Sequence, residues 1–199
     1  MVNVDDGYIK DLTSNLISRK LPISCIVSKT PYTNHDAEYI DSKQLLQSSY
    51  LTASMQNKYD FCLDENILKK LCECERIFLT TSDSLCLYSK TLRERKKLFR
   101  MLCQYWHQIL SNKKIKFVFF PCAPEHGWDI VLFYMAKFLD IETIILVRTM
   151  IKDRVLLRND FRSVNNVPKD FLLNKSAQEM EQSLDDELRT DLWSESSWT

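Results

Sequence analysis

The sequence predicts a three-layer α/β domain in which helices flank a mainly parallel sheet. Three observations lead to this prediction. A strand, a helix and a second strand follow one another between Lys116 and Thr149. The expected strands are continuous apolar runs, as is typical of parallel strands buried on both faces. The chain has 199 residues, 45% hydrophobic and 27% charged, which suits one globular domain with a substantial core.

The strand–helix–strand unit is the clearest part of the pattern. Lys116 to Phe120 is a short apolar run that Pro121 closes, because proline cannot donate to a strand ladder. Thr143 to Val147 is a second such run. Between them, apolar residues from Trp128 onward recur at helical spacing. They are Ile130, Val131, Tyr134, Met135 and Phe138. A right-handed crossover between two parallel strands is therefore expected.

The N-terminal part is expected to contain one helix and two strands. The helix is capped by Asp5 or Asp6 and ended by Pro22. Ile23 to Val27 is the first expected strand, and Ala37 to Ile40 is the second. Between Ser42 and Tyr59 the pattern is weak, with one possible helical face formed by Leu45, Leu46, Tyr50 and Leu51.

Two further helices and a strand are expected before the central unit. A helix begins at Asp64, a strand covers Arg76 to Thr80, and a polar corner that includes Asp83 follows the strand. Thr91 to Ser111 is the longest helix. Its buried face is expected to consist of Leu92, Leu98, Phe99, Leu102, Cys103, Trp106 and Ile109. The charge run Arg93 to Lys97 is interpreted as a solvated surface rather than an anion site, and His107 as a structural histidine.

The chain after Val147 is expected to contribute one strand and an extension. Arg148 and Thr149 stand at the end of the preceding strand, and Arg154 to Arg158 is the next short strand. The α/β domain is expected over residues 1–165. Residues 166–199 form an acidic extension that is partly helical or disordered.

The candidate site is the corner before the Trp128 helix. Ligands of open parallel sheets bind beyond the carboxyl ends of the strands, where helix N-termini also point. Glu125, His126 and Asp129 crowd this corner, and Gly127 there allows a positive φ or a close backbone approach. The alternative is that an acid only caps the helix while His126 is solvated. Both interpretations have about equal weight.

Composition excludes several classes of function. Lysine plus arginine equals aspartate plus glutamate, so a chain-wide footprint for nucleic acid is absent. No apolar run reaches the length of a membrane span, and the acidic N-terminus does not match a signal peptide. Seven irregularly spaced cysteines favour a reducing cytoplasm and no metal site. With two glycines in all, a glycine-rich phosphate loop is nearly excluded, and no serine nucleophile elbow is present. No cofactor is expected.

The stretch from Tyr59 to Asp160 resembles a known family. The segments are YDFCLDENILKKLCECERIFLTTSD and LRERKKLFRMLCQYWHQILSNKKIKFVFFPCAPEHGWDIVLFYMAKFLDIETIILVRT. They resemble the N-terminal half of bacterial capsule and surface-polysaccharide biosynthesis proteins, which look like GT-B glycosyltransferases with two Rossmann domains. The Glu-His-Gly and aromatic-Asp pattern before the helix and the Arg-Thr after the next strand carry most of the resemblance.

The resemblance implies a Rossmann-like domain on the acceptor side of a glycosyltransferase. His126 is then the candidate general base, Glu125 or Asp129 orients it, and Arg148 faces a phosphate or an acidic sugar. Thr149, Asp83 and Gly127 are further candidates for substrate binding. The implied ligands are a sugar nucleotide or a glycan acceptor. Since this sequence ends before a second Rossmann domain could form, we expect either a fragment of a longer protein or a chain that has lost the donor half and serves another purpose. The expected partner is a second Rossmann domain or a partner enzyme. The alternative is a non-catalytic binding or interaction module of the same pathway.

Overall fold

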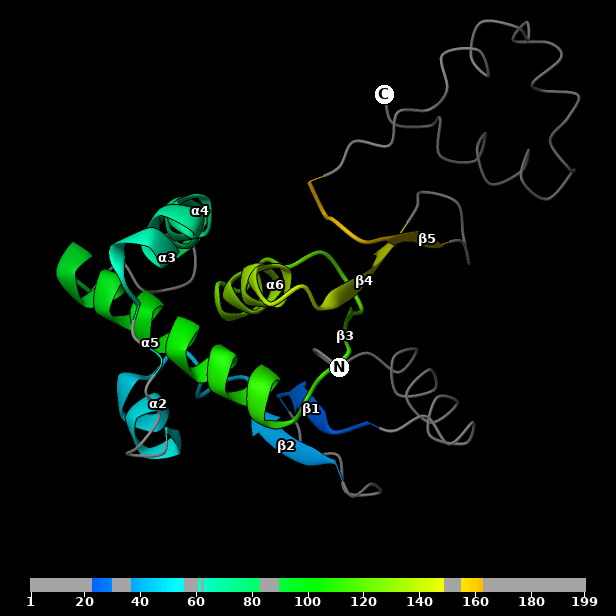
Figure 1. Ribbon diagram of the computed structural model, residues 1–199, viewed down its shortest axis with the longest axis horizontal. Helices are drawn as coiled ribbons and strands as arrows, with labels where there is room; N and C mark the ends of the chain where they lie inside the picture. Colours follow the sequence, from blue (N-terminus) through cyan, green and yellow to red (C-terminus); the bar gives the residue numbers. More distant parts are fainter. Residues whose placement is uncertain are drawn as a thin grey trace, which may run out of the picture.

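The computed structural model of the protein describes residues 23–29, 37–55, 61, 63–82, 90–148 and 155–162. Within them the fold is mixed α/β, with five helices and two small sheets (Figure 1). The strands are β1 (Cys25–Ser28), β2 (Glu38–Asp41), β3 (Phe117–Phe120), β4 (Glu142–Arg148) and β5 (Val155–Arg158). The helices are α2 (Ser48–Ser54), α3 (Glu65–Lys70), α4 (Cys72–Ser82), α5 (Leu92–Asn112) and α6 (Trp128–Phe138).

The central strand–helix–strand unit is confirmed. β3 and β4 pair in parallel, with Phe117 opposite Glu142 and Phe120 opposite Ile145, and α6 packs against both strands. β4 continues three residues beyond its last pair with β3. Its far edge pairs with β5, which runs antiparallel. The carboxyl ends of β3 and β4 therefore lie at the same edge of this sheet.

The two N-terminal strands are also confirmed, but in a sheet of their own. β1 and β2 pair in parallel, and their hydrogen bonds do not extend to β3. The two sheets nevertheless share one hydrophobic core, in which Val27 and Ile40 join Val118, Phe120 and Ile145. Two of the three described strand pairings are thus parallel, and they belong to two sheets rather than one.

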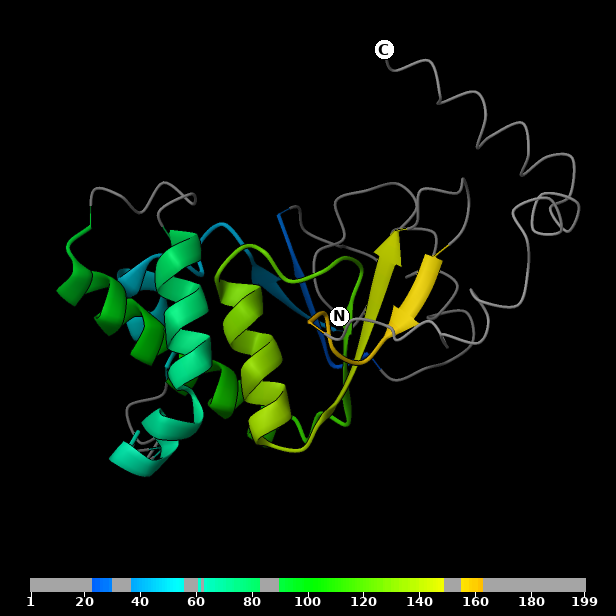
Figure 2. The ribbon, with the colours of Figure 1, turned by 90° about the horizontal axis from the view of Figure 1, so that it is seen from above.

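α5 is the longest described helix and lies between α2 on one side and α4 and α6 on the other (Figures 1 and 2). A capping box fixes its start, since the Thr91 hydroxyl accepts from the Glu94 backbone N–H and the Glu94 carboxylate accepts from the Thr91 N–H. The expected buried face is confirmed at five positions, which are Leu98, Phe99, Leu102, Cys103 and Trp106. The prediction that Leu92 is buried is wrong, because this first helical residue lies beyond the core and is 54% exposed.

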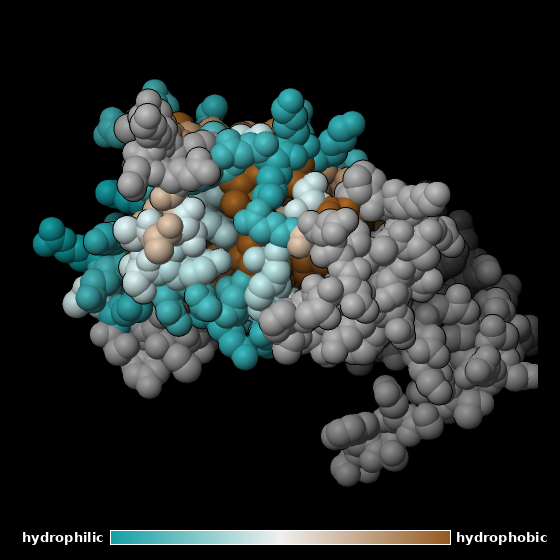
Figure 3. All heavy atoms as spheres, turned by 90° about the horizontal axis from the view of Figure 1, so that it is seen from below, coloured by the Kyte–Doolittle hydropathy of each residue, from teal (hydrophilic) through white to brown (hydrophobic). Residues whose placement is uncertain are grey.

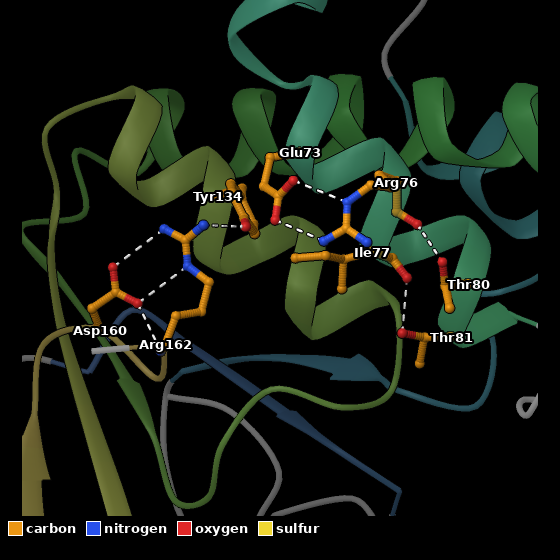
Figure 4. Close-up of polar contacts among 8 residues, drawn as sticks. All are labelled: Glu73, Arg76, Ile77, Thr80, Thr81, Tyr134, Asp160 and Arg162. Carbon is orange, nitrogen blue, oxygen red and sulfur yellow. Dashed lines mark hydrogen bonds and ion pairs between the residues drawn. The ribbon is translucent and has the colours of Figure 1, made fainter. Parts of the chain in front are cut away.

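The predicted strand at Arg76 to Thr80 is wrong, because these residues continue helix α4. Leu71, Cys74 and Phe78 repeat at helical spacing and are all buried, so the core favours a helix over the β propensity of this run. Figure 4 shows that the Thr80 hydroxyl donates a hydrogen bond to the Arg76 carbonyl one turn earlier, which satisfies this polar side chain within the helix. The polar corner that was expected at the end of this strand therefore follows a helix instead.

The segment after β5 is attached to α6 by Arg162 (Figure 4). Its Nη1 donates to the Tyr134 hydroxyl at 2.7 Å, and its other nitrogens contact the Asp160 carboxylate. The guanidinium also lies 5.0 Å from the centre of the Tyr134 ring. These contacts hold the antiparallel strand β5 close to the helix that precedes the central strand β4.

Figure 3 shows the surface of one face, where hydrophilic side chains predominate and apolar atoms appear in gaps between them. Among the described helices, none is long and apolar enough to cross a membrane. The expected first helix and the extension over residues 166–199 lie outside the described residues, as do Asp83 and Thr149.

Candidate functional site

The connection from β3 to α6 begins and ends on buried residues. Pro121 follows β3 directly, Pro124 comes three residues later, and both are buried. Trp128, the first residue of α6, is 3% exposed, and its carbonyl accepts a 3.0 Å hydrogen bond from the buried Trp106 indole of α5. The connection is therefore held against the core at each end.

Gly127 turns the chain into α6 with a positive φ, as the sequence allowed. Its φ of 76° and ψ of −59° form a tight three-residue turn, closed by a 2.9 Å hydrogen bond from the Trp128 N–H to the His126 carbonyl. This γ-turn with positive φ is rare, and a Cβ strains it. Gly127 itself is buried, so its role here is to shape the backbone beside His126.

Gly127→Ala is expected to lower the free energy of unfolding by about 1–3 kcal/mol, because alanine resists this conformation. Chemical denaturation measures the loss. The control is Asp140→Gly, which relieves a positive φ of 55° at the end of α6 and is expected to leave stability unchanged or slightly higher. If Gly127→Ala were as stable as the unaltered protein, the turn would tolerate a Cβ without strain and the prediction would be contradicted.

Asp129 is the polar centre of the corner and is 2% exposed. Its Oδ1 accepts from the backbone N–H groups of His126 at 2.7 Å and Ile130 at 2.8 Å. Its Oδ2 accepts from the Glu125 N–H at 3.0 Å. A buried carboxylate is costly unless such donors surround it. Asp129 therefore fixes the loop and the start of α6 together.

His126 is the one described side chain at this corner that joins Asp129 in an acid–base pair. Its Nδ1 lies 3.1 Å from Asp129 Oδ2, while 29% of its side chain remains exposed. Because an ionised carboxylate only accepts hydrogen bonds, Nδ1 carries the hydrogen, and Nε2 keeps the lone pair that accepts a proton. The imidazole is thus oriented by a buried acid and reachable from solvent.

The charges around His126 favour its protonated form. The hydrogen bond to Asp129 raises the pKa of His126 above its ordinary 6.5, and the charges of Asp129 and Glu125 act in the same direction. Burial and the charge of Lys29 oppose this rise in pKa. A raised pKa stabilises the fold fully below pH 6.5, and that contribution is lost as pH rises through the folded value. The neutral base becomes available over the same rise.

The other predicted site residues are placed less closely. Glu125 is exposed; its N–H contacts Asp129, and its charge acts on His126. Arg148 ends β4 at the same sheet edge as the corner, opposite Val155 of β5. Its side chain, like Thr149 and Asp83, lies outside the described part of the chain.

The N–H groups at the start of α6 were expected to point toward a ligand. Two of them instead donate to groups within the corner itself. The Ile130 N–H donates to Asp129, and the Trp128 N–H donates to the His126 carbonyl. The carboxylate of Asp129 therefore fills the position at which an anion would meet this helix end. A phosphate site built on the α6 N-terminus is disfavoured for this reason.

Lys29 was not identified from the sequence as part of this corner. It directly follows β1, and its positive charge acts to lower the pKa of His126, so Lys29 lies within electrostatic reach of the corner. The rule that ligands meet the carboxyl ends of parallel strands applies to β1 as it does to β3. Applying this rule to the first predicted strand could have identified Lys29 from the sequence.

His107 and two of the cysteines, Cys74 and Cys103, have structural surroundings in the described part of the chain. The His107 ring stacks on Phe61 with centroids 3.6 Å apart, and burial lowers the pKa of His107. Cys74 and Cys103 are fully buried in the core. Among the described residues, no group of histidine, cysteine or acidic side chains is arranged to hold a metal ion.

Comparison of the chain with models of known protein families, with curated proteins and with solved structures found no match.

Proposed function

We propose that this chain is the acceptor-side domain of a polysaccharide-biosynthesis glycosyltransferase, with His126 as the general base. In this proposal the described elements belong to a Rossmann-like three-layer domain, in which the β1–β2 and β3–β4–β5 sheets act as parts of one layer. The two sheets share one core, which supports that arrangement. The donor sugar nucleotide is bound mainly by a second domain, on a longer chain or on a partner enzyme.

The observation that carries the proposal is the pair formed by His126 and the buried Asp129. A general base needs a pKa near the working pH, an acceptor nitrogen within reach of the substrate, and a fixed ring. The 3.1 Å contact through Nδ1 orients the ring and leaves Nε2 as the acceptor. The pair lies beyond the carboxyl end of β3, where α/β sheets bind their ligands.

In the proposed reaction, Nε2 of His126 takes the proton of an acceptor hydroxyl. The hydroxyl oxygen forms a bond to the anomeric carbon of the activated sugar, and the bond from that carbon to the phosphate oxygen breaks. Asp129 stabilises the imidazolium that forms. Arg148, at the end of the neighbouring strand, is the cation proposed to face the departing phosphate. Glu125 contributes a negative charge that favours protonation of His126.

A non-catalytic binding module is the second candidate, and one observation favours it. Asp129 already accepts three backbone N–H groups, so its burial is explained by the architecture of the loop without any proton transfer. In that case the same edge binds a glycan or a partner enzyme, and His126 contributes a hydrogen bond only.

The proposal is tested by titrating the chain with glycan oligosaccharides and with sugar nucleotides while the His126 ring is followed by NMR. Saccharide acceptors are expected to shift the ring resonances of His126 and not those of His107, which serves as an internal control. Sugar nucleotides alone are expected to bind weakly, with millimolar affinity or none. Micromolar binding of a sugar nucleotide to this chain, or an unperturbed His126 at saturating saccharide, would contradict the assignment to an acceptor side.

A further inference from the structure

We propose that the basic face at the start of α5, which the charge pattern alone favours as a solvated surface, binds the surface of an anionic phospholipid membrane. The face consists of Arg93, Lys96, Lys97 and Arg100, all of which are exposed. Their spacing of three, four and seven residues places them on one side of the helix. The opposite side of the same helix is buried in the core, so this face points away from the core of the described residues.

Among the described residues, the acids near this face do not balance its charges. The face has four basic side chains, and residues 92–100 contain one acid, Glu94, which leaves the face with a local charge of 4 − 1 = +3. The Glu94 carboxylate is occupied by the capping box with Thr91. Within the described residues, the one ion pair at this face is the 3.8 Å contact between Lys96 and Glu75, a distance that gives little energy at an exposed site.

The placement of these cations on α5 destabilises the helix in two ways. Cations three and four residues apart on one helix face repel each other. Arg93 also lies in the first turn of α5, at the positive end of the helix dipole, where acidic residues are normally stabilising. An anionic partner removes both costs, because it neutralises the repulsion between the cations and faces the positive helix end.

Three features favour a lipid surface over a nucleic acid. Leu92 is 54% exposed beside the four cations, and an apolar side chain next to basic ones suits the boundary between headgroups and acyl chains. The first turns of α5 lie at the outer edge of the described part of the molecule, at the left in both Figures 1 and 2. The chain as a whole is neutral, so its attraction is local and of short range, as between a basic patch and anionic headgroups.

The test is co-flotation of the full chain with vesicles of phosphatidylcholine containing phosphatidylglycerol, compared with vesicles of phosphatidylcholine alone. Only the anionic vesicles are expected to carry the protein. The variant with Arg93→Gln, Lys96→Gln, Lys97→Gln and Arg100→Gln is expected to bind ~10²-fold more weakly. The matched control is Lys43→Gln, Lys69→Gln, Lys114→Gln and Lys116→Gln, which removes the same charge from exposed positions elsewhere and should bind like the unaltered protein.

Glutamine is a good helix former and the control positions are all exposed, so circular dichroism should show both variants folded. The salt dependence of the unaltered protein gives a readout that does not depend on any variant, and binding is expected to disappear at ~0.5 M salt. Equal binding to neutral vesicles would overturn the proposal, as would equal losses in the two quadruple variants. Binding to an RNA duplex without binding to anionic vesicles would overturn it in favour of a nucleic-acid partner.

Discussion

His126→Asn is expected to lower the rate of glycosyl transfer by ~10²-fold or more. Asparagine keeps a polar side chain of similar reach, and its amide does not take a proton from an acceptor hydroxyl near neutral pH. Because the backbone N–H of His126 still donates to Asp129, the loop should keep its shape. Transfer is measured as release of nucleoside diphosphate from a sugar nucleotide, in the presence of a glycan acceptor and the donor-binding domain.

The matched control for this experiment is His107→Asn. His107 is the other described histidine, lies on α5 and stacks on Phe61, so its removal should leave transfer unchanged apart from a small loss of stability. A rate that does not change in His126→Asn would remove His126 as the base and favour the binding module. A loss of rate in both variants would indicate damage to the fold rather than to the chemistry.

Asp129→Ala is expected to lower the free energy of unfolding by about 2–4 kcal/mol. The substitution leaves the N–H groups of Glu125, His126 and Ile130 without their shared acceptor. The main cost is the loss of these hydrogen bonds at a corner where Asp129 is 2% exposed and the bond from the Ile130 N–H is buried. Urea denaturation, followed by tryptophan fluorescence, measures the change.

Asp160→Ala is the comparison for this prediction. Asp160 is also paired with a cation, Arg162, but it lies at the surface, where such a pair contributes under about 1 kcal/mol. If the two variants lost the same small amount of stability, the carboxylate of Asp129 would not be the centre of the loop that its contacts indicate.

The sequence predicted the secondary structure best where a strand, a polar corner and an amphipathic helix followed one another. β3, α6 and β4 lie close to their predicted bounds, because each has one clear pattern, a continuous apolar run in the strands and helical spacing in α6. Arg76 to Thr80 has two, since an aliphatic, β-branched run also continues the helical spacing of Leu71 and Cys74. Burial of Phe78 against α5 decides between them, and that contact is not visible from local sequence.

The sheet arrangement was predicted only in part for a similar reason. Apolar runs show which segments become strands but not which strands are neighbours or in which direction they run. β5 is antiparallel to β4, and β1 pairs only with β2 among the described strands. These pairings depend on contacts between segments distant in sequence.

At the candidate site, the sequence identified the residues but not their partners. Glu125 and Asp129 were equally good candidates to orient His126, because each is within three residues of it. The structure distinguishes them, since the turn at Gly127 directs the loop over Asp129 and leaves Glu125 exposed. From the sequence, Lys29 could be predicted only as a residue at the carboxyl end of an expected strand, and the fold was needed to bring it near this corner.

The most direct test of a base formed by His126 and Asp129 is the pH titration of the imidazole nitrogens of His126 by NMR. We expect the neutral ring to carry its hydrogen on Nδ1, and its pKa to lie above the ordinary 6.5 and to fall when Asp129 is replaced by asparagine. A neutral ring with its hydrogen on Nε2, or a pKa that does not respond to Asp129→Asn, would contradict the account.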